Sequence, residues 1–303
     1  MRNVKNKGKI KEQLAKRVNM LYAAPATIFF VLFAIVPLLM AFVLSFCQWN
    51  SGIGTPKFVG LDNWTSIFGS EGASVPYDVY KSLWITVKVI IITVLVETPI
   101  SMLFGVWMAK QTKFRSVLSV IFFFPLLFSS AAVSIIFLKF FDPYFGLSSV
   151  LPFFPQNVLG ADMILYTIMF VICWIYIPFH ALLYQGGVRQ IPNDMYEAAK
   201  LDGVSDFKAF FYITLPQLKY TIITSITLQI VGSLTYFDLF YIMAQRSSET
   251  RVLPLLMYMS YQSGNWGKAC VLGSVIAILG LVISLTINRV TGSSKMESQM
   301  EGV

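Results

Sequence analysis

Charged and metal-binding residues are scarce in this chain of 303 residues. Asp, Glu, Lys and Arg together make up 13% of it and hydrophobic residues make up 56%, which excludes an ordinary soluble domain. There is one histidine, His180, and the three cysteines, Cys47, Cys173 and Cys270, are dispersed. Without a Cys/His cluster, neither a metal site nor a histidine-based triad is indicated. We expect buried free thiols and a packed or interfacial histidine.

Sequence signatures of nucleotide hydrolysis are also absent. A glycine-rich phosphate loop would end in Lys followed by Ser or Thr, and the Gly-Asn-Trp-Gly-Lys stretch at 264–268 lacks that spacing. No carboxylate pair or serine elbow is present either. The sequence therefore predicts a non-catalytic chain that binds no cofactor and no metal and cannot hydrolyse ATP itself.

Long apolar runs dominate what is present, and the mean hydropathy is +0.68. A helix needs about 20 mainly apolar residues to cross the hydrocarbon core of a bilayer. Six stretches meet this requirement, so the sequence predicts an all-α polytopic membrane protein with six transmembrane helices. The predicted spans are 20–46, 83–109, 116–140, 163–185, 221–244 and 269–288.

The basic residues are unevenly distributed among the connections between these spans. They cluster before the first span, between the second and third, around the connection between the fourth and fifth, and after the last. With six spans, all four groups lie on one side, which orients both termini toward the cytoplasm. The net charge of +8 then reflects topology and anionic lipid rather than nucleic-acid binding. We predict a basic cytoplasmic arm (1–17), a membrane domain (18–290) and a cytoplasmic tail (291–303).

The polar loop 189–216, between the fourth and fifth spans, contains a predicted short helix at 191–203. Pro192 suits a first helical position, and Asp194 places a negative charge near the free N–H groups of the first turn. Gly203 can adopt the left-handed conformation that ends a helix, and a second short turn can start at Ser205. The loop has too few apolar residues for a core, but enough to press a helix into a groove on another protein.

The same loop carries a family resemblance. Glu197-Ala198-Ala199, Asp202-Gly203 and the Ile-Thr-Leu-Pro stretch ending at Pro216 resemble the EAA loop of binding-protein-dependent ABC importer permeases. Other segments resemble the sugar-uptake branch of this family in particular. They are residues 58–64, Arg115 before the third span, the turn at 142–146 after it, and Phe237-Asp238. In that branch a Gly-Gly-Pro stretch usually follows within a dozen residues of the Phe-Asp pair. This chain instead has Ala-Gln-Arg-Ser-Ser at 244–248. The departure weakens inference about the substrate and the outer loop.

The resemblance implies a type I ABC importer permease fold in a bacterial cytoplasmic membrane. It also implies a second, homologous permease subunit, two cytoplasmic ATPase subunits that use ATP and Mg²⁺, and an extracytoplasmic substrate-binding protein that delivers a sugar or oligosaccharide. The loop would be the coupling helix that docks into an ATPase cleft. Glu197 would make an ionic contact, Ala198 and Ala199 would allow close approach, and Gly203 would set the helix angle. The residues implied in coupling are Glu197, Ala198, Ala199, Asp202, Gly203 and Pro216.

Neutral polar residues mark one face of the fifth span. Ser225, Gln229, Ser233 and Tyr236 follow one another at spacings of four, four and three residues, which places them on one side of a helix. They could line a path for a hydroxyl-rich substrate without the cost of a buried charge. They could equally form hydrogen bonds between helices, as such residues commonly do in bilayers.

Aromatic residues form a similar pattern in the fourth span. Tyr166, Phe170 and Trp174 recur every four residues, and Tyr176 follows. Aromatic rings stack on the C–H faces of sugars, so Trp174 and Tyr176 are further candidates for lining a carbohydrate path. Packing or lipid-facing aromatics would give the same pattern.

A single carboxylate, Glu97, lies within the second span beside Pro99. Such a residue is costly in a bilayer and normally faces the bundle interior. It could be a polar contact in the pathway or a helix–helix hydrogen bond near a proline kink. Three alternative functions remain open from sequence: an ABC permease for a non-sugar solute, an ion-coupled secondary transporter centred on Glu97, and a non-transporting scaffold.

Overall fold

The computed structural model describes residues 22–51, 54–69, 79–110, 112–151, 153–244 and 250–291. Three predicted features lie outside these residues. They are the arm at 1–17, the tail beyond Thr291, and most of the segment 244–248 that differs from the sugar-uptake branch. The described chain forms two units, one containing the residues up to 69 together with 260–274, and the other containing 79–259 and 275–291.

The first unit begins with an apolar helix, Tyr22–Leu44, that contains the π-helical turn η1 (Val31–Ile35) and then α2 (Val36–Leu44). Pro37 follows the π turn by two residues. A proline ring clashes with the carbonyl four residues earlier in a regular α-helix, and a widened turn relieves that clash. No residue of η1 or α2 is buried.

Polar contacts hold together the far end of the first unit. Strands β1 (Cys47–Gln48) and β2 (Lys57–Phe58) pair antiparallel, with Cys47 opposite Phe58. Helix α3 (Asp62–Phe68) follows, and its Asn63 amide donates to the carbonyls of Ser45 and Cys47 at 3.0 and 2.9 Å. These bonds tie the loop after the first span back onto the end of that span.

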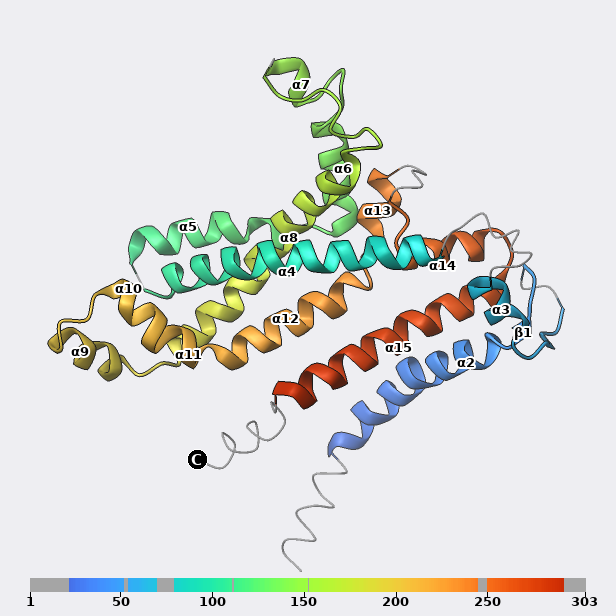
Figure 1. Cartoon of the computed structure of the whole chain (residues 1–303), viewed down its shortest axis with the longest axis horizontal. Coiled ribbons are helices and arrows are strands. Elements are labelled where there is room, and N and C mark those ends of the chain that lie inside the picture. Colours follow the sequence, from blue (N-terminus) through green and yellow to red (C-terminus); the bar gives the residue numbers. More distant parts are fainter. Residues whose placement is uncertain are drawn as a thin grey trace, which may run out of the picture. The chain divides into compact units, whose positions relative to one another are not determined.

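The second unit is built around α4 (Val79–Ala109), which continues unbroken through Pro99, and α8 (Ile164–Arg189). They pack along their length, and α12 (Lys219–Ser233) lies against both (Figure 1). Small and polar residues repeat every four positions on the buried side of α4, at Thr93, Glu97, Ser101 and Gly105. Small side chains let helix backbones approach closely in a membrane.

Gly105 allows a close approach of α4 to α8. A Cβ atom at this position would lie 2.6 Å from the Tyr184 Cβ and 2.7 Å from the Ala181 carbonyl oxygen. We therefore expect Gly105→Ala to lower the stability of the purified chain by about 1–2 kcal/mol, measured by thermal unfolding in mild detergent. Gly186→Ala is the matched control, because a Cβ there meets nothing within 4 Å. Equal unfolding midpoints for both variants would contradict the expectation.

The third predicted span, 116–140, is not one helix. It consists of α5 (Lys113–Phe123), the 3₁₀ turn η2 (Phe124–Leu127) and α6 (Ser130–Phe140), with a bend of 98° between the two arms. Pro125 lies within η2, Phe128 is extended, and the Ser129 hydroxyl accepts the Ala132 N–H to start α6. Pro125 and the N-cap at Ser129 therefore divide the apolar stretch 116–140, which composition alone predicted to be one continuous helix.

The fifth predicted span, 221–244, is also divided. Helix α12 ends at Ser233, and α13 (Asp238–Met243) begins after four residues. The Asp238 carboxylate lies at the start of α13, where the helix dipole favours negative charge, and it accepts a hydrogen bond from Ser130 of α6. Among the described residues, four helices are long and apolar enough to cross a membrane, or up to five if the bent pair counts as one span.

Shorter elements connect the long helices. After α6, the Asp142 carboxylate accepts the backbone N–H groups of Tyr144 and Phe145 at 2.9 and 3.0 Å, which lowers the pKa of this carboxyl and confirms the turn predicted at 142–146. The remaining elements outside the 189–216 loop are α7 (Leu147–Val150), α14 (Leu253–Gln262) and α15 (Trp266–Thr291). Of the three free cysteines, Cys173 is buried as expected, whereas Cys47 and Cys270 are only half-buried.

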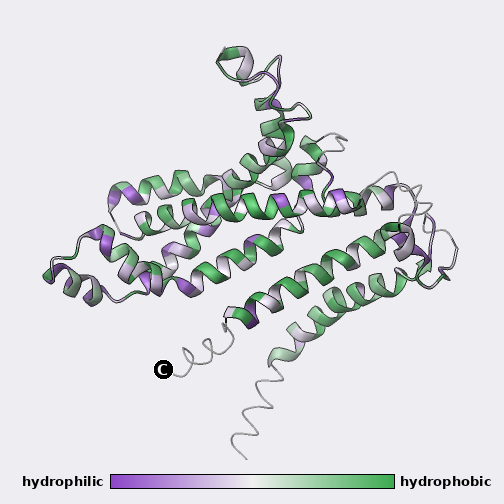
Figure 2. Cartoon of the chain, viewed as in Figure 1, coloured by the Kyte–Doolittle hydropathy of each residue, from purple (hydrophilic) through white to green (hydrophobic). Residues whose placement is uncertain are grey.

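The loop at 189–216 forms a chain of short helices at one end of the second unit. These are α9 (Asn193–Leu201), α10 (Asp206–Ala209), the π-helical turn η3 (Phe210–Thr214) and α11 (Leu215–Gln217). Figure 2 shows hydrophilic residues gathered on α9 and α10, in contrast to the mostly hydrophobic long helices. This contrast singles out the loop as a site of its own.

Candidate coupling loop and buried polar network

Local signals define both ends of α9. The helix begins at Asn193 rather than within the first two residues of the predicted range 191–203, and Pro192 is its N-cap rather than its first helical residue. Asp194 lies in the first turn. At the other end Gly203 has a φ of +73°, which confirms the predicted left-handed conformation. The Gly203 N–H donates to the Lys200 carbonyl at 3.1 Å and the Val204 N–H donates to the Ala199 carbonyl at 2.9 Å. These bonds satisfy carbonyls that the helix end would leave free.

The surface of α9 is open. No residue of the helix is buried, and five of the six residues implied in coupling are exposed, Ala199 being half-buried. Large apolar side chains are also exposed nearby, with Leu201 at 90%, Phe207 at 74% and Tyr212 at 79%. Exposed apolar side chains gathered beside polar ones are typical of a surface that binds another protein.

Two side-chain contacts connect this loop to neighbouring elements. The Tyr196 hydroxyl lies 2.8 Å from the Thr214 hydroxyl, at the end of η3. Asp206, in α10, lies 3.6 Å from the Lys110 ammonium just after α4, although both side chains are well exposed and the pair contributes little stability. The predicted second turn is confirmed, since the Ser205 hydroxyl accepts the Lys208 N–H and α10 starts at Asp206.

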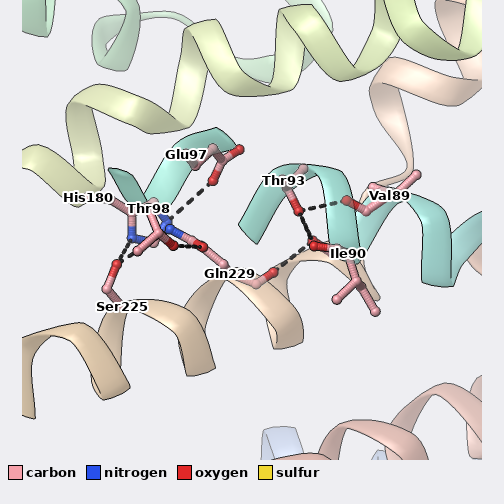
Figure 3. A network of polar contacts seen from close by, with 9 residues as sticks. Val89, Ile90, Thr93, Glu97, Thr98, His180, Ser225 and Gln229 are labelled. Carbon is pink, nitrogen blue, oxygen red and sulfur yellow. Dashed lines mark hydrogen bonds and ion pairs between the residues drawn. The ribbon is translucent and has the colours of Figure 1, made fainter. Parts of the chain in front are cut away.

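The polar face predicted on the fifth span is buried within this chain. Ser225, Gln229 and Ser233 are 0%, 1% and 1% exposed, on the side of α12 that faces α4 and α8. The Gln229 amide oxygen accepts a hydrogen bond from the Thr98 hydroxyl at 2.9 Å (Figure 3). The Ser233 hydroxyl lies 3.4 Å from that of Thr93. In this structure these side chains join α12 to α4. Their role in lining a substrate path stays a prediction.

Glu97 and His180 complete this network. They are 0% and 3% exposed, and the His180 Nε2 lies 3.9 Å from a carboxyl oxygen of Glu97. The other ring nitrogen, Nδ1, lies 2.9 Å from the Ser225 hydroxyl. Among the described residues, neither Glu97 carboxyl oxygen has a hydrogen-bond partner. The imidazole of His180 in α8 thus lies between Glu97 of α4 and Ser225 of α12, so polar contacts connect the three helices (Figure 3).

No local pattern in the sequence predicts that His180 lies next to Glu97. His180 was expected to be a packed or interfacial residue, and burial confirms packing. Its proximity to Glu97 was not predicted, because the two residues lie on different helices far apart in the chain. The available signal was that one histidine and one carboxylate occur deep in apolar spans, where each needs a polar partner.

The aromatic candidates separate into two groups. Tyr176 stacks on Tyr236 with ring centroids 5.1 Å apart, and Tyr236 is 8% exposed. Trp174 instead packs edge-on against Phe137 of α6 at 5.1 Å. The other members of its stripe, Tyr166 and Phe170, are 59% and 56% exposed. The structure therefore brings Tyr176 and Tyr236 together next to the polar face and leaves Trp174 apart from them.

In the part of the chain that the structure describes, four helices are long and apolar enough to cross a membrane, which is typical of a multi-pass membrane protein. Residues 101–292 match the family described as "Binding-protein-dependent transport system inner membrane component". The chain belongs to this family, which confirms the resemblance seen in the EAA loop. Members of the family are permease subunits of ABC transporters.

Curated relatives align over nearly the whole chain. It is 29% identical over 288 residues to the arabinooligosaccharides transport system permease protein AraP of Bacillus subtilis, covering 91% of this chain and 89% of that protein. It is also 29% identical to the trehalose/maltose transport system permease protein MalF of Thermococcus litoralis, covering 92% of this chain and 94% of the relative.

A solved structure shares the fold. A chain of a bacterial ABC transporter involved in the import of the acidic polysaccharide alginate superposes with a TM-score of 0.77 at 20% identity, covering 92% of this chain and 97% of the other. The helical permease fold is therefore shown, although the described helices do not by themselves confirm six spans.

Proposed function

We propose that this chain is a transmembrane permease subunit of an ATP-driven importer that carries a sugar or oligosaccharide across a bacterial cytoplasmic membrane. The observation that carries the proposal is the exposed helix α9, with its EAA sequence, in a chain whose relatives are named for sugar transport. The proposal includes six spans, both termini in the cytoplasm, and the membrane domain at 18–290. The distribution of basic residues supports that orientation.

Energy enters through a partner in this proposal. A separate ATPase subunit binds ATP and Mg²⁺, and its cleft receives α9. The exposed Glu197 carboxylate makes an ionic contact there, and Ala198 and Ala199 let the ATPase surface approach the helix closely. The Gly203 turn fixes the direction of α9. This chain supplies no hydrolytic chemistry and holds no cofactor, and a second, homologous permease and an extracytoplasmic binding protein complete the transporter.

The substrate path involves the polar face of α12. Ser225, Gln229, Ser233 and Tyr236 offer neutral donors and acceptors, which suit sugar hydroxyls. In this structure Thr98 of α4 and His180 of α8 occupy two of these side chains. Substrate can reach them only when α12 separates from α4, so the buried network is the closed form of the path. Tyr176 and Trp174 are proposed as aromatic contacts along the path.

Family membership supports this function over an ion-coupled secondary transporter. The test is purification of the tagged full chain from its native membranes in mild detergent, with identification of the proteins that accompany it. We expect an ATPase and a second permease, and ATP-dependent uptake of at least one sugar after reconstitution with the binding protein. A chain that emerges alone, with uptake driven by a proton or sodium gradient, would overturn the proposal.

A further inference from the structure

Helix α9 has few attachments to the rest of its own chain. Its backbone hydrogen bonds are local, and none of its residues is buried. Within the described part of the chain, the side-chain hydrogen bond from α9 to another element is the one between the hydroxyls of Tyr196 and Thr214, at 2.8 Å. A helix held at its two chain ends and by one side chain can rotate on its loops unless that side chain restrains it.

Thr214 is well placed to transmit a displacement. Its side chain is 3% exposed, so it is fixed in the protein interior, and it is the last residue of η3. Pro216 follows within α11, and Leu218, which is 0% exposed, joins α11 to α12. π turns and prolines weaken the regular hydrogen-bond ladder and are places where helices bend.

The other end of this connection is the buried polar network. Helix α12 starts at Lys219, only five residues after Thr214, and carries Ser225 and Gln229, which bond to His180 and Thr98. Close to the start of α12, a Cβ on Gly187 of α8 would meet the Thr221 hydroxyl at 2.7 Å. A tilt of α12 at its α11 end therefore acts directly on its packing against α8.

We propose that the Tyr196–Thr214 hydrogen bond is the link that passes a displacement of α9 to α12, and so to the buried bonds that close the path. This inference rests on the proposed function, in which an ATPase subunit moves α9. Tyr196 and Thr214 are positioning residues: neither contacts the substrate or ATP. Without their bond, α9 can follow the ATPase while η3 and α12 stay in place, so ATP is hydrolysed without import.

The test uses the complete transporter in proteoliposomes, with Tyr196→Phe, Thr214→Val and the double variant. The measurement is sugar taken up per ATP hydrolysed, together with the KM for the sugar. We expect each single variant to lower this ratio about fivefold, the scale of one lost hydrogen bond, with KM unchanged. Because the two hydroxyls act as one contact, the double variant should also lose about fivefold rather than the product.

Two further variants make the result specific. Thr214→Ser keeps the hydroxyl and should restore the ratio, whereas a purely packing role for Thr214 would leave it lowered. Thr227→Val removes a hydroxyl that bonds within α12, to the Ile223 carbonyl at 2.8 Å, and should leave the ratio at the wild-type value. Wild-type coupling in Tyr196→Phe, or multiplying losses in the double variant, would overturn the link while the ATPase still co-purifies. A wild-type chain that binds no ATPase would overturn the proposed function and the link together.

Discussion

Gly203→Val is expected to reduce sugar uptake at least about tenfold while leaving the chain in the membrane. Gly203 has a φ of +73°, a conformation that is a genuine outlier for a β-branched residue and costs on the order of 1–3 kcal/mol. A Cβ at this position meets no atom within 4 Å, so the effect comes from the backbone and not from a clash. Valine would change the direction of α9 relative to the chain that follows Gly203, and with it the fit of α9 to the ATPase.

The matched control is Gly203→Asn, because asparagine tolerates the left-handed region. It adds a similar volume, and we expect it to keep at least about half of the uptake. Uptake would be measured in cells lacking the native permease, with the amount of chain in the membrane determined by immunoblot. Equal transport by the valine and asparagine variants would show that the turn conformation does not set the coupling geometry.

His180→Ala is expected to destabilise the purified chain by about 2–3 kcal/mol. The substitution opens a cavity between α8 and α12, removes one partner of the Ser225 hydroxyl, and removes the polar group that lies 3.9 Å from the buried Glu97 carboxyl. The measurement is the thermal unfolding midpoint of the full chain in mild detergent, with retention of the folded peak in size-exclusion chromatography as a second readout.

Glu97→Gln provides the control for this pair. Glutamine has nearly the same volume and removes the carboxyl, so we expect a cost within about 1 kcal/mol. In the Glu97→Gln background, the cost of His180→Ala should fall by about 1 kcal/mol, because the stranded carboxyl is no longer there. If His180→Ala costs the same in both backgrounds, Glu97 and His180 act independently.

Features with a local cause were predictable from the sequence. The left-handed turn at Gly203, the cap at Ser205 and the turn at 142–146 each depend on a residue type and its immediate neighbours. The position of Ser225, Gln229 and Ser233 on one side of α12 likewise follows from their helical spacing, whereas their burial depends on packing against other helices. In these cases the side chain and the backbone that responds to it are only a few residues apart.

Features that depend on distant partners were not predictable. An apolar run predicts a span but not whether it bends, so the breaks after Leu127 and Ser233 were missed. The spacing of Ser225 and Gln229 does not reveal that His180 and Thr98 are their partners. The Tyr196–Thr214 bond was missed for the same reason, since η3 brings Thr214 next to α9 only after the whole loop has folded. These contacts follow from tertiary packing rather than from any local pattern.

The π turn η3 also sets the rotation of α12 about its own axis. A π turn contains one residue more than an α-helical turn, and each residue of an α-helix corresponds to about 100° of rotation about the axis. If residues 210–217 formed an uninterrupted α-helix, the side of α12 that carries Gln229 would point more than a quarter turn away from Thr98. The five residues of η3 thus set the direction of the polar face of α12, and loss of one residue there would rotate that face away from Thr98.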